Sequence, residues 1–338
     1  MRGRLLRCSV ALVTTCLVTL AFTDVVSARG LAGATPPPSR WVAVSVATLW
    51  VKPGQTRAID APACANPADP RRWVTSMTTS QRRWLDGRVE TQALYGTRVY
   101  VLAVSGSWSK VAVSGQPTPR NNWGYPGWMP TRQLTQQAPI TGRDTAVIRR
   151  PTAWLWRTTG PRERVLELSY DTRLPAVRWS STSVVVVMLD GRHLDLRRDA
   201  VALYAPGAAW PRPTGAQLVS EAKRFLGLQY LWGGASGFGF DCSGFTHSIC
   251  DALGLTIARD AAPQAARGLM ISTRSALMPG DLIFYKDAKG HIHHVGMYVG
   301  NGTMIHSPAT GQPVCLASIY SEPYFTEFAG GRRYVSSR

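Results

Sequence analysis

Two stretches of the chain, residues 39–137 and 143–206, alternate short apolar runs with Gly, Pro and Ser. This is the pattern of β-strands joined by tight turns. The clearest pair of strands is expected at 98–104 and 108–113. The two stretches are similar in size and style, although their sequences barely match. We therefore predict two small all-β domains.

The pattern changes after a linker rich in proline and alanine, at 206–213. Apolar residues recur with helical spacing in 215–226 and again in 242–253. Strands are then expected at 281–285, 295–299 and 303–306. Helices followed by an antiparallel sheet predict an α+β domain over 214–338.

The N-terminal segment, residues 1–28, has the pattern of a secretory signal peptide: arginines at positions 2, 4 and 7, an apolar run and small residues before a cleavage point. The apolar run is too short to cross a bilayer comfortably. We therefore expect an exported protein (periplasmic, cell-wall-associated or secreted) with no integral membrane segment after signal cleavage.

Charge is concentrated in the middle of the chain. The formal net charge is +18, and residues 29–213 contribute +14 of it. A basic exported region favours polyanions, so an anionic cell-wall polymer is a candidate partner of the β region. The arginines are scattered and no nucleic-acid-binding motif accompanies them. Nucleic acid is therefore not expected, and a solvated basic surface is the simpler interpretation.

Cys242 is the strongest candidate for chemistry, because it follows a glycine-rich loop and stands at the expected start of a helix. The thiolate is the reactive form of cysteine, and a helix N-terminus beside an imidazolium lowers the thiol pKa. A histidine far along the chain would then complete a nucleophilic pair. Cys250 is most simply a small buried hydrophobe, and the states of Cys64 and Cys315 stay open.

Three histidines compete for the role of base: His291, His293 and His294. In an extended strand, Val295 and Met297 share a face with His293, whereas His294 lies on the other face. The apolar face should be core, so His294 should point to a cleft. The remaining two are interpreted as polar surface. These histidines lack partners at zinc-like spacing, so no metal and no organic cofactor is expected.

Four ordered motifs resemble the NlpC/P60 family of cell-wall peptidases: Asp241-Cys242-Ser243-Gly244, Pro279-Gly280-Asp281-Leu282-Ile283-Phe284, His294-Val295-Gly296-Met297-Tyr298-Val299-Gly300 and Met304-Ile305-His306. The two upstream blocks resemble bacterial SH3 (SH3b) modules. The fold class implied is α+β, with a papain-like catalytic domain preceded by two small all-β SH3-like barrels. The arrangement is similar to that of γ-D-glutamyl-L-diamino acid endopeptidases, which cleave murein peptides.

The resemblance implies a cysteine peptidase in which Cys242 attacks, His294 transfers the proton and His306 orients it. It also assigns the substrate site. Asp241 and Ser243 would hold the free amine of an N-terminal L-Ala, Tyr230 would lie near the oxyanion and Trp232 would wall the peptide site, and Glu90 and Tyr125 of the first β domain would cap the amine pocket.

Each assignment has a plainer structural alternative. Asp241 could cap the helix, and His306 could be a buried structural histidine. Tyr230 and Trp232 could be core aromatics, and Glu90 a solvated acid. Ala261 departs from the family, which often has a substrate-binding serine at this position.

The hairpin between His294 and His306 decides whether the two rings face each other. A three-residue loop, 300–302, pairs Gly296 with His306 and puts both histidines on one face of the sheet. A two-residue turn, Asn301-Gly302, shifts the register by one residue and puts His306 on the opposite face. We predict the three-residue loop, with its last glycine in the left-handed conformation.

Two rival functions remain at this level. An amidase or endopeptidase acting on intact peptidoglycan would keep the same catalytic residues. A wall-binding protein would act through its basic β domains without catalysis. Diaminopimelate and lysine are equally compatible with the motifs as the third residue of the substrate peptide.

Overall fold

The fold is described from a computed structural model, which describes residues 35–208 and 210–335. The predicted signal peptide, 1–28, lies outside the described residues. Within the described part of the chain, none of the helices has both the length and the hydropathy that a bilayer span requires. Residues Pro37–Arg338 form one compact unit, in which three modules follow one another along the chain.

The first β-module, residues 39–135, is an antiparallel seven-stranded sheet with the order β3-β2-β6-β5-β4-β1-β7. The predicted hairpin at 98–113 is present, with its strands facing each other from Val99↔Val113 to Ser105↔Trp108. The strands are β1 (Ser39–Val42), β2 (Val46–Trp50), β3 (Val89–Leu94), β4 (Arg98–Ser105), β5 (Trp108–Val113), β6 (Tyr125–Pro130) and β7 (Leu134–Thr135).

One insertion between β2 and β3 is helical, where the sequence was expected to be all-β. The local capping residues explain it. The Asp69 side chain accepts a hydrogen bond from the amide of Arg72, and Thr78 forms a capping box with Gln81. The short helices are η1 (Ala58–Asp60), α1 (Ala61–Cys64), α2 (Pro70–Ser76) and α3 (Thr79–Arg83), and η2 (Thr131–Gln133) precedes β7.

The second β-module, residues 144–204, repeats this architecture with the strand order β10-β9-β13-β12-β11-β8-β14. Alternate side chains of its strands, among them Leu155, Leu174 and Val186, fill a separate hydrophobic core. The elements are β8 (Asp144–Ile148), β9 (Thr152–Arg157), β10 (Arg164–Ser169), β11 (Arg173–Trp179), β12 (Ser183–Val187), β13 (His193–Arg197), η3 (Arg198–Ala200) and β14 (Val201–Tyr204).

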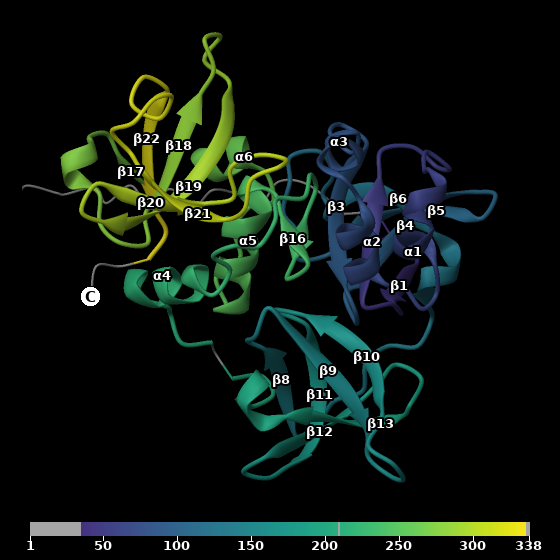
Figure 1. Ribbon diagram of the computed structural model, residues 1–338. Coiled ribbons are helices and arrows are strands. Elements are labelled where there is room, and N and C mark those ends of the chain that lie inside the picture. Colours follow the sequence, from purple (N-terminus) through teal and green to yellow (C-terminus); the bar gives the residue numbers. More distant parts are fainter. Residues whose placement is uncertain (1–34, 209, 336–338) are drawn as a thin grey trace, which may run out of the picture. The chain divides into compact units, whose positions relative to one another are not determined.

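The α+β module, residues 215–333, packs helix α5 against strand β19 of a six-stranded sheet with the order β17-β22-β18-β19-β20-β21 (Figure 1). Phe245 and Ile249 of α5 share a core with Val295 and Met297 of β19. The elements are α4 (Gly215–Lys223), β15 (Ala235–Ser236), β16 (Gly239–Phe240), α5 (Cys242–Ala252), α6 (Ala261–Ala265), β17 (Leu269–Ile271), η4 (Arg274–Ala276), β18 (Leu282–Lys286), β19 (Ile292–Gly300), β20 (Thr303–His306), β21 (Cys315–Ser318) and β22 (Phe328–Arg333).

The β19–β20 hairpin has the predicted register by a different route. The predicted three-residue loop is wrong: Asn301 and Gly302, with φ of 50° and 68°, form a two-residue turn, and Gly300 pairs with Thr303. An irregularity between Tyr298 and Gly300 inserts one extra residue into β19. This bulge compensates for the shorter turn, so the pairing continues from Met297↔Ile305 toward Gly296 and His306. A Cβ on Gly296 would lie 3.3 Å from the Cβ of His306.

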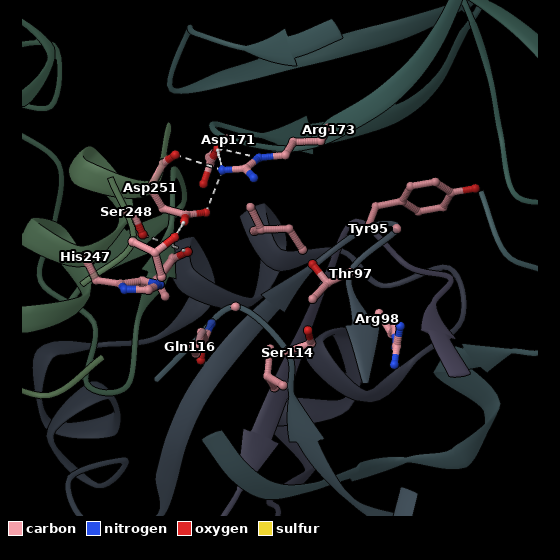
Figure 2. A pocket seen from close by; sticks show the side chains of 16 residues that line it. Tyr95, Thr97, Arg98, Ser114, Gln116, Asp171, Arg173, His247, Ser248 and Asp251 are labelled. Carbon is pink, nitrogen blue, oxygen red and sulfur yellow. Dashed lines mark hydrogen bonds and ion pairs between the residues drawn. The ribbon is translucent and has the colours of Figure 1, made fainter. Parts of the chain in front are cut away.

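The C-terminal end of α5 is held by arginines of the second β-module. Arg149 donates to the carbonyl of Ala252 (2.7 Å), and Arg173 donates to the carbonyl of Asp251 (2.8 Å). Figure 2 shows Arg173 between the carboxylates of Asp171 and Asp251, which lie 3.3 and 2.7 Å from its Nη2. Cations at the C-terminal end of a helix donate hydrogen bonds to its last carbonyl groups and interact favourably with the helix dipole.

Candidate active site

Cys242 is the first residue of α5, at the place where the helix amides are free to face a reacting group. The preceding Asp241 is the N-cap, and its Oδ1 accepts a hydrogen bond of 2.6 Å from the amide of Gly244. The capping role considered for Asp241 is therefore present. Cys242 is half-buried and lines a cleft of about 360 Å³ between the first β-module and the α+β module.

The thiol of Cys242 is neutral in this structure. Burial raises its pKa to about 12, and the Asp241 carboxylate acts in the same direction. Backbone amides of Val295 and Ser243 lower the pKa, but by less than burial raises it. The expectation that the position of Cys242 lowers its thiol pKa is therefore corrected, because burial and the Asp241 carboxylate together raise that pKa. The contact with the Val295 amide places Sγ beside the residue that follows His294.

The two predicted partners, His294 and His306, lie on one face of the sheet and touch. His294 Nε2 and His306 Nδ1 are 2.8 Å apart, and the two side chains are only 7% and 1% exposed. The ring of Tyr324 packs edge-on against His306 with a centroid distance of 5.3 Å. Burial lowers the pKa of His294 to about 3 and that of His306 to about 4, so both rings are neutral near pH 7.

Cys315 also belongs to this line of contacts, and the sequence did not assign it a role there. Cys315 lies directly across from His306 in the β20–β21 pair, and its Sγ is 3.6 Å from His306 Nε2. The other two histidines of the cluster are more exposed and bind acids: His291 faces Asp287, and His293 Nε2 lies 3.1 Å from Glu327.

The cleft contains every one of the predicted substrate residues. All six line it, namely Glu90, Tyr125, Tyr230, Trp232, Asp241 and Ser243, and the predicted nucleophile Cys242 lies among them. Trp232 is 38% exposed, and its indole N–H donates to the carbonyl of Val89 at 3.0 Å, which fixes the ring against the first β-module. Tyr230 is buried, and burial raises the pKa of its hydroxyl well above the usual range. The expectation that His294 and not His293 faces the cleft is corrected here: His293 lines the cleft, whereas His294 and His306 are buried within the sheet and do not.

Arg259 is the buried charge that organises this cleft. Its guanidinium is 1% exposed and binds both carboxylate oxygens of Asp241, at 3.1 and 2.7 Å. It also donates to the hydroxyls of Ser243 (3.2 Å) and Thr91 (2.9 Å), so it joins the start of α5 to strand β3 of the first β-module. The charge pair is desolvated, and each member requires the other.

The wall of the cleft contributed by the first β-module carries a second charge network. Arg120 binds Glu90 through two hydrogen bonds of 2.6 and 2.8 Å, and it also donates to the hydroxyl of Tyr125. That hydroxyl in turn donates to Asp260 at 2.9 Å. Arg120, Arg259 and Asp260 were not assigned from the sequence. Arg259 and Asp260 directly precede Ala261, the position at which the family often has a substrate-binding serine, and this adjacency could have pointed to them. Arg120 lies in a loop that carries no such motif.

Among the described residues, no group of three His, Cys, Asp or Glu side chains is arranged to hold a metal ion. The site contains a thiol, two neutral imidazoles that contact each other and a cleft bordered by carboxylates and guanidiniums. This set fits nucleophilic attack by sulfur with imidazole as the proton acceptor.

The chain belongs to the NlpC/P60 family of cysteine peptidases. The model of the NlpC/P60 family matches residues 227–333, and that of the YKFC SH3b2 domain matches residues 148–204. The expected fold class, an α+β NlpC/P60 domain preceded by SH3-like β-modules, is confirmed.

Two curated relatives extend the match over nearly the whole chain. The gamma-D-glutamyl-L-lysine dipeptidyl-peptidase of Bacillus cereus is 43% identical over 302 residues, which is 87% of this chain and 90% of the relative. The protein of the same name from Bacillus subtilis is 38% identical over 296 residues, 86% of this chain and 97% of the relative. The crystal structure of an NlpC/P60 family protein from Bacillus cereus is 41% identical, covers 88% of this chain and 100% of that one, and superposes with a TM-score of 0.83.

Proposed function

We propose that this protein is an exported peptidase that cleaves the bond between γ-D-glutamate and an L-diamino acid in murein stem peptides with a free N-terminal L-Ala. The observation that carries this proposal is the charged cleft beside Cys242, because its far wall comes from the first β-module. A long or branched chain could not extend through that wall, so the site favours the free end of a short peptide.

The charge of the cleft supports an amine at that end. Three carboxylates, those of Asp241, Glu90 and Asp260, meet two guanidiniums, those of Arg259 and Arg120. With every group ionised, one negative charge remains, which complements a single ammonium group. The relatives' names contain L-lysine, and we extend that residue to this chain as the diamino acid on the leaving side.

In the proposed reaction, Cys242 Sγ forms a bond with the γ-carbonyl carbon of D-Glu while its proton passes to His294. The contact between Nε2 of His294 and His306 leaves Nδ1 as the nitrogen that can accept this proton. The carbon–nitrogen bond then breaks, and His294 returns the proton to the departing amine. Water hydrolyses the thioester and releases the L-Ala–γ-D-Glu dipeptide. His306 keeps the imidazole oriented throughout.

The three modules have different roles in this proposal. We infer that residues 39–137 and 143–206 are the two SH3-like domains and that 214–338 is the catalytic domain. The basic charge of the β region supports an anionic wall polymer as its partner. Export through the N-terminal segment, 1–28, would bring the enzyme to its substrate.

The test is mass spectrometry of synthetic peptides after incubation with the full-length enzyme. The substrates are L-Ala-γ-D-Glu-L-Lys, its diaminopimelate counterpart and an N-acetylated form of each. We expect release of L-Ala-γ-D-Glu from the free-amine peptides only, and none with Cys242→Ala. Equal cleavage of the acetylated peptides, or faster digestion of intact sacculi than of tripeptide, would contradict the proposal.

A further inference from the structure

Cys315 ends a line of contacts that starts at the proposed base. His294 Nε2 lies 2.8 Å from His306 Nδ1, and His306 Nε2 lies 3.6 Å from Cys315 Sγ. Strand pairing fixes this geometry, because His306 and Cys315 are direct neighbours across β20 and β21. Both nitrogens of His306 therefore have one partner each.

The protonation of the two rings is coupled, because a single hydrogen lies between them. If His306 carries its proton on Nδ1, it donates to His294, and a neutral His294 must then hold its own proton on Nδ1. In that form His294 has no free nitrogen for the proton of Cys242. If His306 carries its proton on Nε2 instead, it accepts from His294 Nε2–H. The Nδ1 of His294 is then free to act as a base.

The productive form places an N–H on Nε2 of His306, and this N–H needs an acceptor. His306 is 1% exposed and its ring is packed against Tyr324, so bulk water does not reach it. Within the described part of the chain, the sulfur of Cys315 is the partner of Nε2. Partial burial raises the pKa of the Cys315 thiol, so the sulfur is a neutral acceptor that leaves the proton on His306.

We propose that Cys315 is a positioning residue that holds His306 in the Nε2–H tautomer and thereby keeps His294 ready to accept the proton of Cys242. This inference rests on the proposed function for its kinetic consequence, although the tautomer itself can be measured without any substrate. The effect should appear in kcat rather than in KM, since Cys315 does not line the substrate cleft.

The kinetic test compares Cys315→Ala, Cys315→Ser and Leu316→Ala on the tripeptide. Leu316 is the matched control, since it follows Cys315 on the same strand and is 48% exposed. Cys315→Ala removes the acceptor, and a buried donor without a partner is costly, so kcat should fall about tenfold with KM unchanged. The acid limb of its kcat profile should move to lower pH, because a protonated His294 would be less stabilised. Cys315→Ser keeps an acceptor and should restore most of the rate.

The tautomer test is independent of the substrate. In full-length Cys242→Ala protein with ¹⁵N-labelled histidine, the ring signals of His306 should report a proton on Nε2. Adding Cys315→Ala should convert that signal to Nδ1–H or to a mixture. A proton on Nδ1 of His306 while Cys315 is present would overturn the proposal, and so would a Cys315→Ala enzyme indistinguishable from Leu316→Ala. If the wild type does not cleave the tripeptide, the proposed function fails and the ring signals still decide this inference.

Discussion

His306 illustrates at the scale of one residue how burial governs the chemistry of the site. Its ring and that of His294 are removed from water, and the hydrogen-bond partners of the two rings among residues 35–208 and 210–335 include no carboxylate. Burial without a counter-charge lowers the pKa of an imidazole, because the charged form is the one that loses solvation. Near pH 7 the pair therefore stays neutral, and a thiol that gave up its proton nearby would supply the counter-charge that the protonated ring lacks.

The same shift predicts acid sensitivity of the fold. The unfolded-state pKa of histidine is near 6.5 and the folded pKa of His306 is about 4. The unfolded chain therefore binds the proton first as pH falls, and stability that is complete above pH 6.5 is lost toward pH 4. Between pH 7 and 4.5, His306 alone should account for roughly 2 kcal/mol of this loss.

Urea unfolding at pH 7 and at pH 4.5 measures this loss in the free energy of unfolding. His306→Gln should show a smaller loss between pH 7 and 4.5 than the wild type. His291→Gln is the control, because His291 is 75% exposed and should leave the wild-type pH dependence unchanged. An identical pH dependence in His306→Gln and the wild type would mean that the ring is not buried in its neutral form.

The identity of the site residues could be predicted from the sequence wherever a short motif carries them. Cys242, Asp241 and Ser243 are adjacent, His294 was chosen by alternation along its strand, and His306 was implied by the family resemblance. Arg120, Arg259 and Cys315 could not be assigned in this way, because their roles depend on contacts between residues far apart in the chain. Arg259, for example, meets Thr91 of the first β-module, 168 positions away.

At the scale of elements, the β19–β20 hairpin shows that the pairing of two strands can be predicted from the sequence while the geometry of the turn cannot. The requirement that His306 share a face with His294 gave the correct pairing, since a slip by one residue reverses every side chain. The way this pairing is reached was not predictable: a tight turn and a bulge replace a longer loop. Both solutions leave the same apolar residues in the core, so hydrophobic periodicity does not distinguish them.

The turn itself gives a prediction. Asn301 adopts φ of 50°, a conformation that Asn tolerates and most other side chains resist. Asn301→Ala should lower the free energy of unfolding by about 1 kcal/mol. Asn301→Gly should be close to neutral, since glycine accepts this conformation without strain. Chemical denaturation measures both. Equal losses in the two variants would show that the Asn side chain, not its backbone, matters here.

At the scale of the whole molecule, the substrate cleft belongs to no single module. Tyr125 of β6 shows this directly, since its hydroxyl accepts from Arg120 of the first β-module and donates to Asp260 of the α+β module. The overall architecture could be predicted from composition and periodicity. The contacts between the modules could not, because the hydrophobic pattern of one module carries no information about which residues of the other it meets.

Tyr125→Phe removes that hydroxyl and keeps the ring. We expect KM for the free-amine tripeptide to rise about fivefold with little change in kcat, because the loss affects binding of the peptide end and not the bond that breaks. Steady-state kinetics measures both constants. Tyr100→Phe, on strand β4 outside the cleft, is the control and should match the wild type. A fall in kcat with unchanged KM would place the hydroxyl in the chemical step instead.

The two arginines at the far end of α5 have a wider consequence. Arg149 and Arg173 belong to the second β-module, and Arg259 ties the near end of the helix to the first. A fragment that begins at α4 would lose Thr91 as the partner of Arg259, both arginines at the far end of α5 and one wall of the cleft. We therefore expect such a fragment to hold α5, and with it Cys242, less firmly than the full-length protein does.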